Sequence, residues 1–143
     1  MMQNAHLLYP MAALVLLTFC VAVVMLRRRI AAARNRQVKV NDFRIYQFGD
    51  DVPETMITAA RNFSNLFETP VLFYAVCLSA MVLGTTDLVM VAMAWAYVVI
   101  RYFHSYIHVT HNTVLVRMRV FAVSLLVLLA MWIWTVARAA GIA

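Results

Sequence analysis

The stretch Arg61–Gly84, RNFSNLFETPVLFYAVCLSAMVLG, places charged and amide side chains directly before a long apolar run. A helix rises about 1.5 Å per residue, so roughly 20 apolar residues cross the hydrocarbon core of a bilayer. The run therefore predicts a membrane-spanning helix. Charged groups at the mouth of such a helix need a partner or water, because a charge that faces lipid is costly.

The composition of the whole chain agrees with a membrane protein. Of its 143 residues, 65% are hydrophobic, and the mean hydropathy is +0.83, far from the balance of a soluble domain. Four long apolar segments predict an all-α membrane protein in which residues 1–143 form a single domain, a bundle of four transmembrane helices. The predicted spans are residues 7–26, 56–83, 88–111 and 114–137, with a basic cytoplasmic loop at residues 27–54.

Lysine and arginine residues are unevenly divided between the two ends of these spans. Short loops rich in them stay in the cytoplasm, and of the 12 such residues only Arg138 falls on the opposite side. We therefore expect both termini and the Gly84–Asp87 turn to face away from the cytoplasm, in the inner membrane of a bacterium. Topology and anionic membrane lipids then explain the net charge of +6, and no soluble basic domain remains to bind nucleic acid.

The second span carries start and stop signals at its ends. Asp51-Val-Pro-Glu54 has the form of a helix start, with proline at an early helical position and an acidic residue in the first turn. We expect one continuous helix from near Val52 to Leu83, ended by Gly84, with one of the residues Thr85–Asp87 capping the next helix.

Two of the predicted helices each carry a polar stripe at the same depth. Arg61, Asn65 and Glu68 are spaced i, i+4 and i+7, which places them within about 60° of one another. The next helix carries a stripe about 90° wide, formed by Arg101, His104, His108 and Asn112. A single stripe can be an arginine that snorkels to water and pairs with its own glutamate. Two stripes at one depth indicate a shared polar cavity.

The chemistry of these side chains suits a small zwitterionic peptide. Arginines form bidentate hydrogen bonds with carboxylates, and Glu68 can accept a hydrogen bond from an ammonium group. Asn65 can both donate a hydrogen bond to an amide and accept one from it. Arg117, at the start of the fourth helix, adds a cation that favours a thiolate over a thiol. This combination points to glutathione. His104 and His108 lack an acidic or cysteine partner at ligand spacing, so we expect no metal.

The chain resembles the MAPEG family, the membrane-associated proteins in eicosanoid and glutathione metabolism, over nearly its whole length. The pattern Arg61-x-x-x-Asn65-x-x-Glu68, closely followed by Pro70, is similar to the second-helix signature of microsomal glutathione transferases, prostaglandin E synthase and leukotriene C synthase. The proline follows the glutamate by two residues, whereas the eukaryotic enzymes have it later.

The third helix resembles the family in two alternative frames. Arg101-x-x-His104-x-x-x-His108 is similar to the prostaglandin synthase pattern, which has tyrosine at the place of His108. The sequence RYFHSY instead resembles leukotriene C synthase, with Tyr102 and Tyr106 spaced like its tyrosines. On a helix these tyrosines lie about 100° and 140° from the direction of Arg101, away from the polar stripe. We favour the histidine frame.

The resemblance implies a homotrimer that binds glutathione between subunits near the cytoplasmic side and takes a lipophilic small molecule from the bilayer. It gives the binding role to Arg61, Asn65 and Glu68, helped by Arg101 and by an arginine at the end of the first helix, taken as Arg28 among Arg27, Arg28 and Arg29. The catalytic candidates are Arg117, His104 and His108.

The implied activity is that of a glutathione-dependent transferase or peroxidase acting on lipophilic electrophiles. Two alternatives stay open. One is a non-catalytic scaffold or lipid-binding protein with the same fold. The other is a small four-helix drug transporter, which needs an acidic residue deep in a span.

Overall fold

The structure is a computed structural model, and it describes residues 5–39 and 52–142. Along the chain run α2 (Leu8–Arg34), α4 (Glu54–Asn65), α5 (Thr69–Leu83), α6 (Leu88–Val109) and α7 (Val114–Ala139), and the described residues contain no strand. With α4 and α5 taken as one interrupted span, 4 segments are long and apolar enough to cross a membrane. The predicted all-α membrane fold is confirmed.

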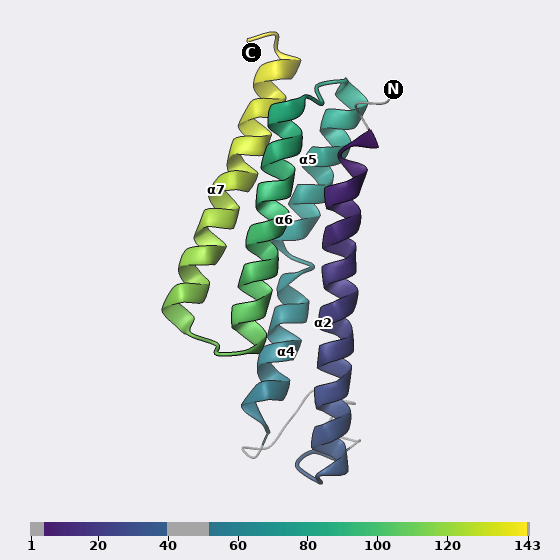
Figure 1. The fold of residues 1–143 in the computed structure, drawn as a ribbon, viewed down its shortest axis with the longest axis vertical. Coiled ribbons are helices and arrows are strands. Elements are labelled where there is room, and N and C mark those ends of the chain that lie inside the picture. Colours follow the sequence, from purple (N-terminus) through teal and green to yellow (C-terminus); the bar gives the residue numbers. More distant parts are fainter. Residues whose placement is uncertain (1–4, 40–51, 143) are drawn as a thin grey trace.

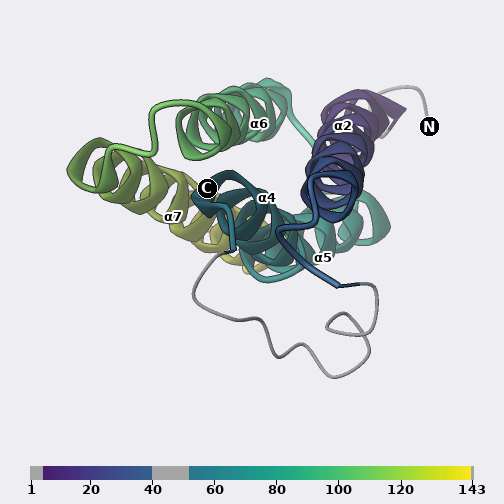
Figure 2. The same ribbon diagram turned by 90° about the horizontal axis from the view of Figure 1, so that it is seen from below.

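The helices run roughly parallel to one axis (Figure 1). Seen along that axis, α6 lies beside α7, and α2 lies beside the α4 and α5 pair (Figure 2). The starts of α2 and α6 and the ends of α5 and α7 lie at one end of the bundle, while the α6–α7 connection lies toward the other (Figure 1). The two ends of the described chain and the Gly84–Asp87 turn thus share one end, as the span count predicts.

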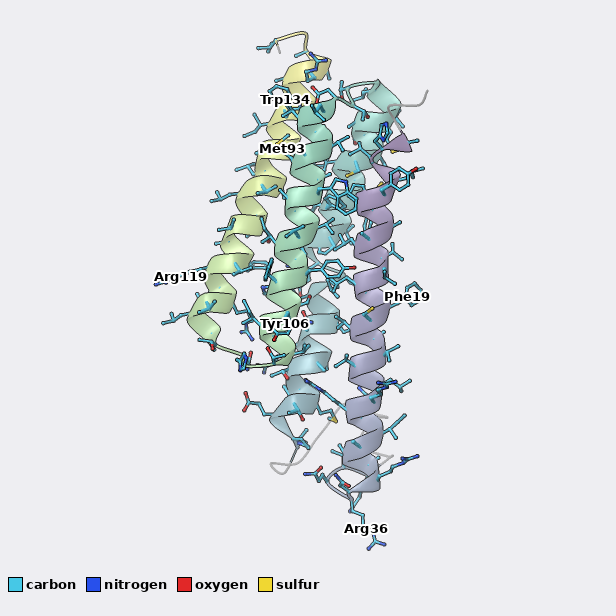
Figure 3. The ribbon with its side chains drawn as sticks, in the orientation of Figure 1. Phe19, Arg36, Met93, Tyr106, Arg119 and Trp134 are labelled. Carbon is cyan, nitrogen blue, oxygen red and sulfur yellow. The ribbon has the colours of Figure 1, made fainter. Side chains whose placement is uncertain are left out.

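The bundle is apolar both inside and outside. Phe73 and Tyr97 are fully buried, and their rings stack with centroids 4.7 Å apart. Large apolar side chains also point outward: Phe19 is 67% exposed and projects away from the bundle (Figure 3), and Val82 is 85% exposed. Such a surface would promote aggregation in water, whereas lipid tails solvate it.

The first helix is longer than expected. It continues to Arg34 instead of ending at Leu26, so Arg27–Arg29 lie on the helix and not in a loop. Alanine and arginine are good helix formers, and arginine side chains reach water from the edge of a membrane, so nothing at Leu26 stops the helix.

The expectation of one continuous second helix is wrong. α4 ends at Asn65 and α5 begins at Thr69, with Glu68 in a non-helical conformation (φ −93°, ψ −93°). Pro70 lies in the first turn of α5, and its ring would clash with the carbonyl of Leu66 in an unbroken helix. The proline near Glu68 therefore sets the break.

The other helix ends follow the sequence signals with two corrections. Gly84 ends α5 with a left-handed φ of 68°, and the Asp87 side chain accepts from the backbone N of Met90 at 2.8 Å, capping α6. Pro53 lies just before α4 as its N-cap and not inside the helix, and Asp51 is outside the described residues. Because α6 ends at Val109, Asn112 lies in the following turn (φ 46°) and not on a helical stripe.

Candidate functional site

A polar pocket of about 260 Å³ lies between α4, α6 and α7 at the level of the helix break. We call it the polar pocket. Its lining joins both predicted polar stripes to the fourth helix and consists of Arg61, Asn65, Glu68, His104, His108, Arg117, Met118 and Phe121. The first six of these are residues that the sequence proposes for binding or catalysis.

The α4 side of the polar pocket carries Arg61 and Asn65, and the break that follows carries Glu68. Arg61 and Glu68 are exposed and Asn65 is half-buried. The Asn65 amide nitrogen donates to Glu68 Oε2 at 3.3 Å. Although Glu68 has left the helix, it still lies on the same side as Arg61 and Asn65.

The α6 side of the polar pocket is formed by two buried histidines. His104 is 4% exposed and His108 is 5% exposed, and their ring centroids lie 5.7 Å apart. Nδ1 of His104 and both ring nitrogens of His108 have no hydrogen-bond partner among the described residues. Buried polar atoms are usually hydrogen-bonded, and each unpaired one costs free energy. The wall of this pocket therefore offers groups that a polar ligand or water can satisfy.

Arg117 lines the polar pocket from the first turn of α7, and its side chain is held by a hydrogen bond to Asn112. Its Nη1 donates to Asn112 Oδ1 at 2.6 Å, and the Asn112 amide nitrogen donates to Glu54 Oε1 at 3.1 Å. These two hydrogen bonds connect the start of α7 to the start of α4. A guanidinium has five N–H donors, and the bond to Asn112 uses one of them.

Arg101 does not line the polar pocket. Its side chain is 0% exposed, and Nη2 donates to Asn65 Oδ1 at 2.5 Å and to the Asn65 carbonyl at 3.3 Å. Its guanidinium carbon lies 5.7 Å from the centre of the Phe121 ring. Arg101 is therefore outside the lining of this pocket and is joined to it through Asn65, while its Nε and Nη1 have no hydrogen-bond partner among the described residues.

Arg28 is also placed elsewhere. Its guanidinium donates to the Thr55 carbonyl at 2.8 Å and to the Val109 carbonyl at 2.5 Å, joining α2 to the start of α4 and the end of α6. The structure of the single chain does not bring Arg28 to the polar pocket, and its binding role stays a prediction.

The two tyrosines of the alternative frame lie on the side of α6 that faces α2. Tyr102 and Tyr106 line an apolar groove of about 560 Å³ together with Ala13, Trp95, Val98, Val99 and Phe103. The Tyr102 hydroxyl donates to the Ala13 carbonyl at 2.8 Å. The histidines face the polar cavity and these tyrosines do not, as the favoured frame requires.

Met118 and Phe121 are lining residues that the sequence analysis missed. The Phe121 ring lies 5.6 Å from the ring of His104, and Phe121 follows Arg117 by one helical turn. The spacing i, i+4 on α7 places Phe121 on the same face as Arg117, and this signal was available in the sequence. These two side chains give the polar pocket an apolar wall.

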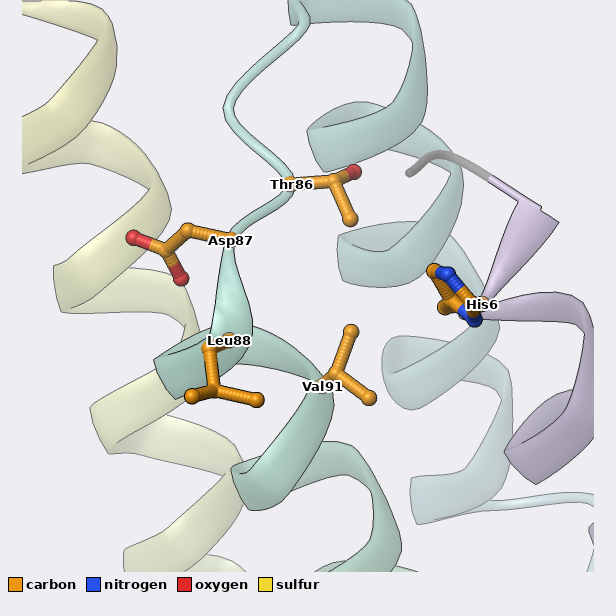
Figure 4. Close-up of a pocket in the computed structure, with 5 residues that line it drawn as sticks. All are labelled: His6, Thr86, Asp87, Leu88 and Val91. Carbon is orange, nitrogen blue, oxygen red and sulfur yellow. The ribbon is translucent and has the colours of Figure 1, made fainter. Parts of the chain in front are cut away.

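A second cavity, of about 310 Å³, lies at the opposite end of the bundle and is lined by His6, Thr86, Asp87, Leu88 and Val91 (Figure 4). The Asp87 carboxylate points away from His6 in this view. It accepts from Trp134 Nε1 at 3.1 Å and lies 3.6 Å from Arg138 Nε. This carboxylate fastens the α5–α6 turn to α7, so its role is structural.

Comparison with known proteins gives one finding. The model of the MAPEG family matches residues 7–137. Neither the curated proteins nor the solved structures give a match.

Proposed function

The chain belongs to the MAPEG family, and from this premise we propose that it binds glutathione and uses it as a transferase or peroxidase on lipophilic electrophiles. The observation that supports this most is the polar pocket itself. Two arginines, an asparagine–glutamate pair and two buried histidines with unpaired nitrogens converge there on one cavity.

The lining matches glutathione group by group. Glutathione carries two carboxylates, an ammonium group, two amides and a thiol. Arg61 suits one carboxylate, Arg117 suits the sulfur, and Glu68 suits the ammonium group. The unpaired ring nitrogens of His104 and His108 suit the amides. Placed together, these groups would hold an extended zwitterion across the pocket.

The proposed chemistry begins with the thiol. The positive charge of Arg117 stabilises the thiolate, which is the nucleophilic form, and the thiol proton passes to water. The sulfur then attacks an electrophilic carbon, so that a carbon–sulfur bond forms and the leaving group departs with its electron pair. With a hydroperoxide, two thiols are oxidised to a disulfide and the peroxide is reduced to an alcohol and water. His104 and His108 are the remaining catalytic candidates.

The apolar partner would reach the sulfur from the bilayer. Met118 and Phe121 supply an apolar wall of the polar pocket, and Met118 is 58% exposed. We also propose a homotrimer, in which one of the arginines Arg27–Arg29 on α2 of a neighbouring subunit completes the site. Arg27 is exposed on that turn of α2, whereas Arg28 is engaged within its own subunit.

The proposed orientation places the polar pocket on the cytoplasmic side and both termini on the other side of a bacterial inner membrane. A reporter enzyme fused after Ala143 is then active in the periplasm. Activity of the reporter in the cytoplasm would contradict this orientation.

Turnover tests the proposed function directly. The detergent-solubilised protein is incubated with glutathione and a chlorodinitrobenzene, or with a lipid hydroperoxide. We expect turnover that saturates with glutathione for at least one of the two substrates. Glutathione binding without turnover of either class would favour the non-catalytic scaffold.

A further inference from the structure

α6 braces the break between α4 and α5 with three polar side chains on one of its faces. Tyr97, Arg101 and Ser105 are spaced four residues apart, which keeps them within about 80° on the helix, and all three are buried. Their hydrogen bonds cross to both sides of the break: Tyr97 Oη to Thr69 Oγ1 (3.4 Å), Arg101 Nη2 to Asn65 Oδ1 (2.5 Å) and Ser105 Oγ to Asn62 Oδ1 (3.2 Å).

Arg101, at the centre of this brace, provides a hydrogen-bond donor for the Asn65 carbonyl, which the break leaves without its usual helical partner. In an unbroken helix the Asn65 carbonyl would accept from the backbone N–H of Thr69, but α4 ends at Asn65. An unsatisfied carbonyl at membrane depth is strongly destabilising. The Asn65 carbonyl instead accepts from Arg101 Nη2 at 3.3 Å and from the backbone N–H of Glu68 at 3.4 Å.

The same guanidinium also fixes which way the Asn65 side chain faces. A guanidinium only donates hydrogen bonds, so the amide oxygen of Asn65 must be the atom that faces Arg101. The amide nitrogen is then turned toward Glu68 Oε2, 3.3 Å away on the lining of the polar pocket. Asn65 therefore presents N–H groups to the pocket and not its oxygen.

We propose that Arg101 is a positioning residue that acts on the ligand through Asn65. It caps the broken helix and locks the amide, so that the ligand atom bound at Asn65 must be an acceptor, a carbonyl or carboxylate oxygen. The identity of the ligand as glutathione rests on the proposed function, whereas the brace does not depend on it.

Asn65→Asp tests the locked amide with almost no change of shape. Aspartate keeps a partner for the buried Arg101 but replaces the N–H groups beside Glu68 with an oxygen. We expect glutathione affinity to fall at least tenfold in a protein that still folds. Affinity within threefold of wild type would mean that Asn65 offers an acceptor, which would overturn the inference.

A double-mutant cycle tests whether Arg101 acts through Asn65. Glutathione affinity is measured for Arg101→Gln, for Asn65→Ala and for the combined variant. If Arg101 acts only through Asn65, the combined variant binds within twofold of Asn65→Ala. Losses that multiply would show an independent contact of Arg101 with the ligand and would overturn the inference. Arg119→Gln, an exposed arginine on α7, is the matched control and keeps wild-type affinity.

Hydrogen–deuterium exchange tests the brace without any ligand. In Arg101→Gln, exchange of the backbone N–H groups in residues 65–71 should rise about tenfold, the scale of losing one charge-assisted hydrogen bond, and it should stay unchanged in Arg119→Gln. Unchanged exchange in Arg101→Gln would overturn the brace. A wild-type protein that binds no glutathione would instead overturn the proposed function, and the exchange result would still decide the brace.

Discussion

The two sides of α6 carry aromatic side chains two residues apart and differ completely in what they face. His104 and His108 are at most 5% exposed and face the polar pocket, with ring nitrogens that lack a partner. Tyr102 and Tyr106 are 37% and 60% exposed and line an apolar groove beside α2. Residues two apart on a helix point about 200° from each other, so this difference follows from register alone.

The neighbours of α6 set the chemistry of each side. α4 and α7 bring arginine and asparagine to the histidine side, and the break after α4 brings Glu68, whereas the α2 residue that lines the groove on the tyrosine side is Ala13. Changes on the histidine side should therefore alter glutathione chemistry, and changes on the tyrosine side should alter stability only.

The largest expected effect belongs to Arg117. In Arg117→Ala, conjugation of a chlorodinitrobenzene should fall about 10- to 1000-fold, the scale of one lost electrostatic stabiliser, while glutathione affinity stays within a few fold. A thiolate absorbance band at about 240 nm on adding glutathione should also disappear, because the cation no longer favours the thiolate.

Arg119→Ala is the control for this variant, since Arg119 is exposed on the same helix and points away from the bundle (Figure 3). It should keep the wild-type rate. A folded Arg117→Ala protein with an unchanged rate would show that Arg117 only anchors α7 at the membrane surface, and would move catalysis to His104 or His108.

Arg28 should matter for stability more than for binding within its own subunit. Arg28→Ala removes two charge-assisted hydrogen bonds to backbone carbonyls, at Thr55 and Val109, so we expect a loss of about 2 kcal/mol in the free energy of unfolding. Arg27→Ala, at the exposed neighbouring position, should change this free energy by less than about 0.5 kcal/mol. Equal losses in the two variants, measured by unfolding in detergent, would contradict the assignment.

The smallest effects are expected on the tyrosine side. Tyr102→Phe removes the hydrogen bond to the Ala13 carbonyl and should cost about 1 kcal/mol of stability, without changing glutathione affinity more than twofold. Tyr106→Phe should leave both quantities unchanged. A tenfold loss of affinity in either variant would show that the tyrosine frame supplies the ligand site.

Much of the site could be predicted because helical periodicity and span counting act locally. Spacing and residue type predict six of the lining residues of the polar pocket, and they meet because α4 and α7 both pack against α6. The roles of Gly84 as a helix end and Asp87 as a helix cap could also be predicted, since a left-handed turn and a helix cap each depend on one residue.

The sequence does not reveal which polar side chains line the pocket and which only contact the lining residues. Arg101 shares a stripe with His104, yet it bonds to Asn65 and is not among the residues that line the pocket, and no spacing rule gives that difference. Pro70 is a sequence signal of the break at residues 66–68, because proline fits the first turn of a new helix and disrupts the interior of an unbroken one.

Unfolding of the detergent-solubilised protein, measured with and without glutathione, tests the central claim most directly. A ligand that binds only the folded state at a hundredfold excess over its dissociation constant adds about 2.7 kcal/mol to the free energy of unfolding. We expect this gain in wild type and in Tyr106→Phe, and its loss in Arg61→Ala and in Glu68→Ala. If millimolar glutathione leaves the unfolding of wild-type protein unchanged, the polar pocket is not a glutathione site.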